Sequence, residues 1–195
     1  MTPLEVDRDR VRRHDVAAMI LAALADDAGL DALRGRLATA PRDDPTGQRL
    51  RAGLAAATAF RRAKVDGATP LGIALGAAAC LFREGLFFEA HERLEGEWRT
   101  LRGRRRSALR GVIQLAVALH HLAHGNARGA GSLVTKARGH LARDGDALEE
   151  VDASAVLAAF APWERAIRAG RWPTYLEPAV LVLRVSSVRA RPPSA

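Results

Sequence analysis

The sequence has a single cysteine, Cys80, and few aromatic residues, which make up 5% of its 195 residues. One cysteine excludes a disulfide within the chain and a metal site built only from cysteines. Cys80 lies in the apolar run 77–82, where a free thiol usually behaves as a small buried hydrophobe. The scarcity of aromatics, together with abundant alanine, favours closely packed helices over β-sheets. We therefore predict an all-α protein.

The sequence also lacks an apolar segment long enough to cross a bilayer. The longest uncharged apolar run, 71–82, is shorter than the roughly 20 residues that a membrane-spanning helix needs. Residues 1–7 lack the charged start and the apolar stretch of a signal peptide. These two absences predict a cytoplasmic protein that does not bind membranes.

Lysine is nearly absent, so arginine carries almost all of the formal net charge of +8. A basic chain raises the question of a nucleic-acid partner. However, the arginines are scattered among acids, except in the run 102–106, which we interpret as a solvated turn. Nucleic-acid binding through the basic surface is therefore the second of our alternative functions.

The length predicts a single domain with attached ends. We divide it into an Ala/Arg-rich helical extension at 1–68 that packs on or precedes the core, a core domain at 69–172, and a proline-containing tail at 173–195. Helical periodicity in the extension predicts helices at 15–25, 31–38 and 48–65. Turn residues predict a loop at 39–47 and a break at 66–68.

Capping and turn residues divide the core into helices. Threonine as N-cap before proline, at Thr69 and Pro70, is typical of a helix start, and Gly85 is expected to end this helix. Further helices are expected at 86–101, from Ser107 to His124, from Asn126 to about residue 144, and from Asp152 or Ser154 to Gly170. Two antiparallel helical hairpins would form the centre of an irregular array of about six or seven helices.

The segment 87–98 contains the most informative polar residues of the chain. On a helix, His91 shares a stripe with Phe87, Leu94 and Trp98, and the apolar members indicate that this stripe faces inward. Glu95 lies one turn beyond His91 on the same face. We therefore expect an imidazole and a carboxylate to meet in the interior.

The next helix contributes two further polar residues. Gln114 and His121 are seven residues apart, which places them on nearly the same line of a helix. A buried glutamine needs hydrogen-bond partners. If the two helices are neighbours, His91, Glu95, Gln114 and His121 can converge.

Two motifs connect this region to a known family. Residues 89–98 read Glu-Ala-His-Glu-x-Leu-Glu-x-x-Trp, and residues 111–130 read Gly-x-Ile-Gln-Leu-Ala-x-Ala-x-x-His-x-x-x-Gly-Asn-x-x-Gly-Ala. Together they resemble domain of unknown function family 309, over roughly residues 72–143. The family is described as all-helical and has no established activity. The resemblance therefore implies a fold and the importance of six residues: His91, Glu95, Trp98, Gln114, His121 and Asn126.

Three functions compete for the polar cluster. The favoured one is a non-enzymatic helical scaffold or interaction module, with a protein partner or a second copy of the chain, in which the cluster is a buried hydrogen-bond network. The first alternative is a metal-dependent or acid–base enzyme centred on His91, Glu95 and His121, which could hold zinc, iron or manganese although the sequence requires no cofactor. In a binding groove, Trp98 and His91 would be the anchors, with Gln114 and Asn126 as further binding candidates. Asn126 is also a natural helix cap.

Overall fold

The computed structural model describes residues 3–41, 44–63 and 69–169. These residues form eight α-helices, one short 3-10 helix and no β-strand, which confirms the all-α prediction with a slightly higher helix count. The elements are α1 (Pro3–Ala25), α2 (Asp27–Ala38), α3 (Pro45–Arg62), α4 (Pro70–Arg83), α5 (Phe87–Thr100), α6 (Gly103–Ala123), α7 (Ala127–Asp144), η1 (Gly145–Ala147) and α8 (Ala153–Arg168). The expected helix break at 66–68 and the tail at 173–195 lie outside the described residues.

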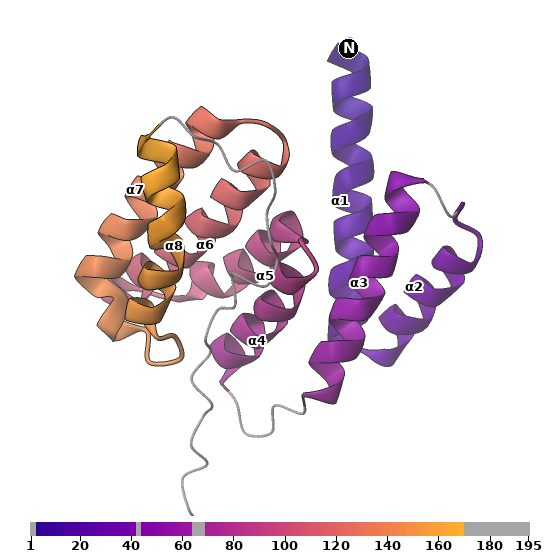
Figure 1. Cartoon of the computed structure of the whole chain (residues 1–195). Coiled ribbons are helices and arrows are strands. Elements are labelled where there is room, and N and C mark those ends of the chain that lie inside the picture. Colours follow the sequence, from indigo (N-terminus) through magenta and orange to yellow (C-terminus); the bar gives the residue numbers. More distant parts are fainter. Residues whose placement is uncertain (1–2, 42–43, 64–68, 170–195) are drawn as a thin grey trace, which may run out of the picture.

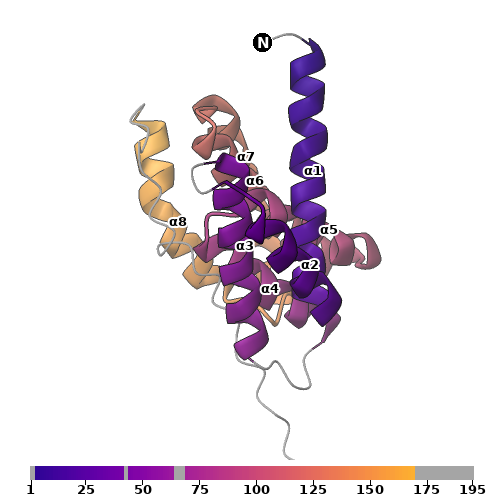
Figure 2. The same ribbon diagram turned by 90° about the vertical axis from the view of Figure 1, so that its right-hand side faces the viewer.

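The helices form two groups that lie side by side (Figure 1). The first group contains α1, α2 and α3, and the second contains α4 to α8. The first turns of α1 extend beyond the other helices, as the perpendicular view in Figure 2 also shows. Between the groups, α1 contacts α5 and α3 contacts α4. One continuous hydrophobic core includes Ile20 and Leu50 from the first group and Leu94 and Phe160 from the second.

Two glycine turns connect the central helices. Gly85 follows α4 and Gly125 follows α6, with φ angles of 71° and 72°, a backbone region that favours glycine. At each turn the chain closes with a hydrogen bond between residues five apart: the Leu86 N–H donates to Leu81 O at 2.9 Å, and the Asn126 N–H donates to His121 O at 2.8 Å. This is the Schellman type of helix ending, and it folds α5 back on α4 and α7 back on α6.

Side-chain caps fix most of the helix starts. Thr69 accepts a hydrogen bond from the Gly72 N–H at 3.0 Å, and Asn126 accepts one from the Gly129 N–H at 2.9 Å, as the sequence predicts. The Asp152 carboxylate does the same for the Ala155 N–H at the start of α8. No described helix has both the length and the apolar character that crossing a membrane requires.

Several predicted boundaries are wrong. Helix α1 begins at Pro3 rather than at 15, and α2 begins at Asp27 rather than at 31. Ser107 does not begin a helix, because α6 already starts at Gly103 and includes the arginines of the basic run. Arginine is a good helix former, and these side chains also find partners on neighbouring elements, so the run is not a solvated turn. In the first group, α3 starts at Pro45 rather than at 48, because Asp44 caps it and proline suits the first helical position.

Helices α6 and α7 approach each other closely at Gly111. An added Cβ at this position would lie 2.8 Å from the Leu141 side chain and 3.1 Å from the Ala137 carbonyl oxygen. Glycine therefore allows the two helices to pack against each other here. Gly96 on α5 has no such neighbour, since a Cβ there would meet nothing within 4 Å.

We expect Gly111→Ala to lower the free energy of unfolding by about 1–3 kcal/mol, because the new methyl group overpacks the contact. The control Gly96→Ala, at an exposed helical position, should raise it by about 0.4–1 kcal/mol, because alanine has fewer conformations in the unfolded chain. Urea unfolding followed by circular dichroism measures both changes. Equal effects of the two substitutions would contradict the close approach of α6 and α7.

Candidate functional site

Helix α5 brings His91 and Glu95 together. The His91 Nε2 lies 3.0 Å from Glu95 Oε1, and Arg99 donates to the other oxygen of Glu95 at 3.0 Å. The His91 side chain is 19% exposed and that of Glu95 is 32% exposed. The pair therefore lies at the edge of the protein rather than in its interior. Because water reaches both groups, their contact contributes only modestly to stability.

The other two members of the predicted cluster make no direct polar contact with this pair. The side-chain oxygen of Gln114 is buried and accepts no hydrogen bond from the described residues. His121 Nδ1 lies 3.0 Å from the Asn126 side-chain nitrogen, so this histidine belongs to the α6–α7 turn. Among the described contacts, no hydrogen bond or ion pair joins Gln114 or His121 to His91 or Glu95.

The described part of the chain contains no group of three or more histidine, cysteine, aspartate or glutamate side chains placed to share a metal ion. His91, Glu95 and His121 are therefore not assembled as a common ligand set. Only the first two contact each other.

Trp98 packs under an arginine of the basic run. The guanidinium carbon of Arg106 lies 3.9 Å from the centre of a Trp98 ring, a cation–π contact. The indole Nε1 of Trp98 is buried and donates to no described acceptor. The neighbouring arginines also have partners, since Arg105 pairs with Glu150 at 2.7 Å.

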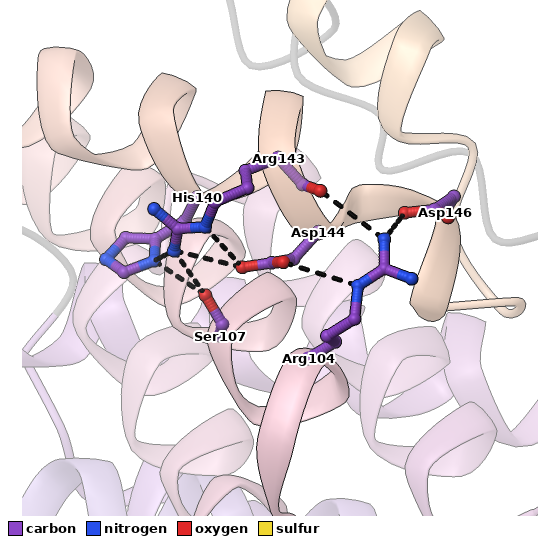
Figure 3. A network of polar contacts seen from close by, with 6 residues as sticks. All are labelled: Arg104, Ser107, His140, Arg143, Asp144 and Asp146. Carbon is purple, nitrogen blue, oxygen red and sulfur yellow. Dashed lines mark hydrogen bonds and ion pairs between the residues drawn. The ribbon is translucent and has the colours of Figure 1, made fainter.

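Figure 3 shows the network that holds the start of α6 to the end of α7. Arg104 pairs with Asp146 at 2.6 Å and with Asp144 at 3.4 Å, and Arg143 contacts Asp144 at 2.9 Å. The Ser107 hydroxyl, and after it the adjacent Arg143, lowers the pKa of the Asp144 carboxyl. Ser107 Oγ also lies 2.9 Å from His140 Nδ1. Burial, followed by the charges of Arg110 and Arg143, lowers the pKa of His140.

The ion pair between Glu89 of α5 and Arg49 of α3 was not predicted from the sequence. Glu89 has a side-chain exposure of 0%, and Arg49 of α3 donates from Nε to its Oε1 at 2.6 Å. The second oxygen, Oε2, is buried and accepts no hydrogen bond from the described residues. Glu89 is the first residue of the quoted motif, but periodicity could not identify its partner, which lies 40 residues earlier in the chain.

Phe88 lies at the centre of a group of rings beside this ion pair. Its ring centre is 5.2 Å from that of His14, 5.9 Å from that of His91 and 5.6 Å from that of His120. The rings of His121 and His124 are in turn 6.4 Å and 4.2 Å from that of His120. Five of the six histidines in the chain therefore belong to one connected group, with members on α1, α5 and α6 and at the α6–α7 turn.

His120 is held in its neutral form. Burial, followed by the positive charges of His124, Arg13, Arg49 and His121, lowers its pKa to about 4. No acidic group is among the causes of this pKa shift. The His124 Nδ1 lies 2.8 Å from the His120 carbonyl oxygen and donates to it.

A hollow lined by His120, His124, Arg49 and Glu89, among others, has a volume of about 310 Å³.

These features define an all-α protein of packed helical hairpins, with its polar motif residues on α5, α6 and the turn that follows. Residues 75–133 match the model of the family described as "Domain of unknown function (DUF309)". The match confirms the resemblance that the two motifs indicate. Helices α1 to α3 and α8 lie outside the matched residues. Neither the curated proteins nor the solved structures include a match to this chain.

The pKa of His120 makes stability depend on pH. Because burial lowers it from 6.5 to about 4, the folded protein binds fewer protons than the unfolded chain between these values. The contribution of neutral His120 to the free energy of unfolding is therefore fully present above pH 6.5. It is lost as the pH falls from 6.5 toward 4, the pKa of His120 in the folded protein. Between pH 7 and pH 5, we expect the natural protein to lose about 1–2 kcal/mol more stability than His120→Gln.

Urea unfolding of both proteins at the two pH values measures this difference. The remaining histidines are common to both proteins, so most of their contributions cancel in the comparison. An equal loss of stability in the two proteins would show that His120 is not shielded from protonation.

Proposed function

We propose that this protein is a non-enzymatic helical scaffold or interaction module, whose motif residues fix how its helices pack. The observation that carries the proposal is the pairing of Glu89 with Arg49, which joins the motif helix α5 to α3 of the N-terminal group. A carboxylate removed from water must be compensated by a cation. Burial of Glu89 therefore requires the first group to stay in place.

Other motif residues also support a structural role. Asn126 caps α7 and contacts His121 at the turn between α6 and α7. Trp98 supports Arg106 of the following helix. Each of these contacts joins two elements of the same chain, as expected for a scaffold.

We place the scaffold in the cytoplasm. Its binding partner is another protein or a second copy of the chain. Cys80 is a buried free thiol, and reducing compartments keep thiols in this state. The paired arginines of the basic run have fewer donors left for phosphate groups, which makes nucleic acid the less favoured partner.

The test of the scaffold is Glu89→Ala. We expect it to lower the free energy of unfolding by about 2–4 kcal/mol, because it leaves the Arg49 guanidinium without its partner in the junction. Amide hydrogen exchange should show protection in α1 to α3 falling more than protection in α6 and α7. The control Glu84→Ala removes an exposed carboxylate near the end of α4 and should change stability by less than about 0.5 kcal/mol.

A double-mutant cycle separates the pair from other effects of the substitution. If Glu89 and Arg49 act as a unit, Arg49→Met should cost much less stability in the Glu89→Ala background than in the natural protein. Catalytic residues behave differently, because replacing them often leaves stability unchanged or raises it. Unchanged or increased stability of Glu89→Ala would overturn the scaffold proposal.

We also propose a second candidate function, a metal-dependent or acid–base enzyme centred on His91, Glu95 and His121. The contact between the His91 imidazole and the Glu95 carboxylate favours it, because such a pair is suited to proton transfer and to binding of a divalent transition metal. Element analysis of the purified protein distinguishes the two functions. Stoichiometric metal that disappears in His91→Ala and Glu95→Ala would support the metal-dependent enzyme, and protein without metal would favour the scaffold over it.

A further inference from the structure

A hollow of about 310 Å³ opens where the two helical groups meet. Four segments line it: the start of α3, the turn between α4 and α5, the start of α5, and the end of α6. Its walls combine charged and ring-bearing side chains with apolar ones such as Leu86 and Ala52. The volume suits a small organic molecule rather than a chain segment.

Arg49 is the best-positioned donor in this hollow. Its Nε is fixed by Glu89 at 2.6 Å, and the side chain is 25% exposed. In the described contacts, the two terminal nitrogens of Arg49 donate to no group. A guanidinium that is oriented by a buried carboxylate, with its terminal nitrogens free, presents two parallel donors to a carboxylate or a phosphate.

The hollow has one lining side chain with a full positive charge, Arg49. Its acidic lining residues are Glu89, which Arg49 compensates, and Glu84, which is exposed. The lining imidazoles of His120 and His124 add no negative charge, and the positive charge of Arg13 of α1 also acts on His120. The lowered pKa of His120 reflects burial and this positive surrounding.

One wall of the hollow can contact an apolar group of a ligand. Phe88 lines the hollow, and its ring lies 5.8 Å below the guanidinium carbon of Arg49. The Glu89 carboxylate itself is buried behind this wall, where it holds Arg49. A guanidinium beside a ring is typical of a site that orients a small polar molecule.

We propose that this hollow binds a small organic oxyanion, with its carboxylate or phosphate on Arg49 and its apolar part against Phe88. Glu89 is a positioning residue for Arg49. His120 and His124 line the same hollow on the side of α6. The site does not depend on the scaffold function, since a ligand could occupy it in a protein of either proposed kind.

Titration of the full chain with four probes tests the site: benzoate, phenyl phosphate, inorganic phosphate and benzamide. Amide chemical shifts should report saturable binding of benzoate or phenyl phosphate, with changes at the start of α3, the start of α5 and the end of α6. Comparison of these two probes distinguishes a carboxylate from a phosphate ligand. Benzamide, which has the shape of benzoate without its charge, should bind at least about tenfold more weakly.

Arg49→Lys keeps a cation beside Glu89 but removes the planar pair of donors, so it should weaken binding about tenfold or more while the protein stays folded. The control Arg62→Ala removes an exposed charge from the same helix, away from the hollow, and should leave binding unchanged. Phe88→Leu should weaken the phenyl-bearing probes and leave inorganic phosphate unaffected. Equal binding of benzoate and benzamide, equal effects of Arg49→Lys and Arg62→Ala, or no saturable binding of any anion would overturn the proposal.

Discussion

Burial of the Glu89 carboxylate is the constraint on which the arrangement of the two helical groups depends. Removing a carboxylate from water is costly unless a well-placed cation compensates it, and Arg49 of α3 supplies that cation. The motif helix α5 can therefore keep Glu89 buried only while α3 lies against it. Although the family match begins at residue 75, the preceding helices complete the environment of a motif residue. The continuous core that includes Ile20 and Leu94 has the same consequence.

Several arginines of this basic chain form contacts between elements. Arg104 and Arg105 pair with acids on the segment from α7 to α8, and Arg106 lies over Trp98. A planar guanidinium can form several directed hydrogen bonds and can also stack on a ring, which a lysine ammonium cannot do equally well. The net charge of +8 is therefore a weaker sign of a nucleic-acid partner than its size suggests.

The features that the sequence predicts correctly are local ones. The Asn126 cap and the His91–Glu95 contact each join groups three or four residues apart, so helix geometry alone determines them. The Glu89–Arg49 pair joins residues 40 apart, and helical periodicity indicates which face is buried but not which helix covers it. The grouping of histidines around His120 was missed for the same reason, because α1, α5 and α6 each contribute to it.

The environments of the α5 carboxylates bear on both candidate functions. Glu95 is held by His91 on one side and by Arg99 on the other, and it is 32% exposed. Water screens such a group, so it gains little of the low-dielectric environment that strengthens catalytic carboxylates. Among the described carboxylates of α5, Glu89 alone is fully buried, with a single guanidinium as partner. The polar chemistry of this helix is therefore concentrated on its face toward α3, where a carboxylate, a guanidinium and the neutral imidazole of His120 meet, and less on the His91–Glu95 face that the sequence emphasises.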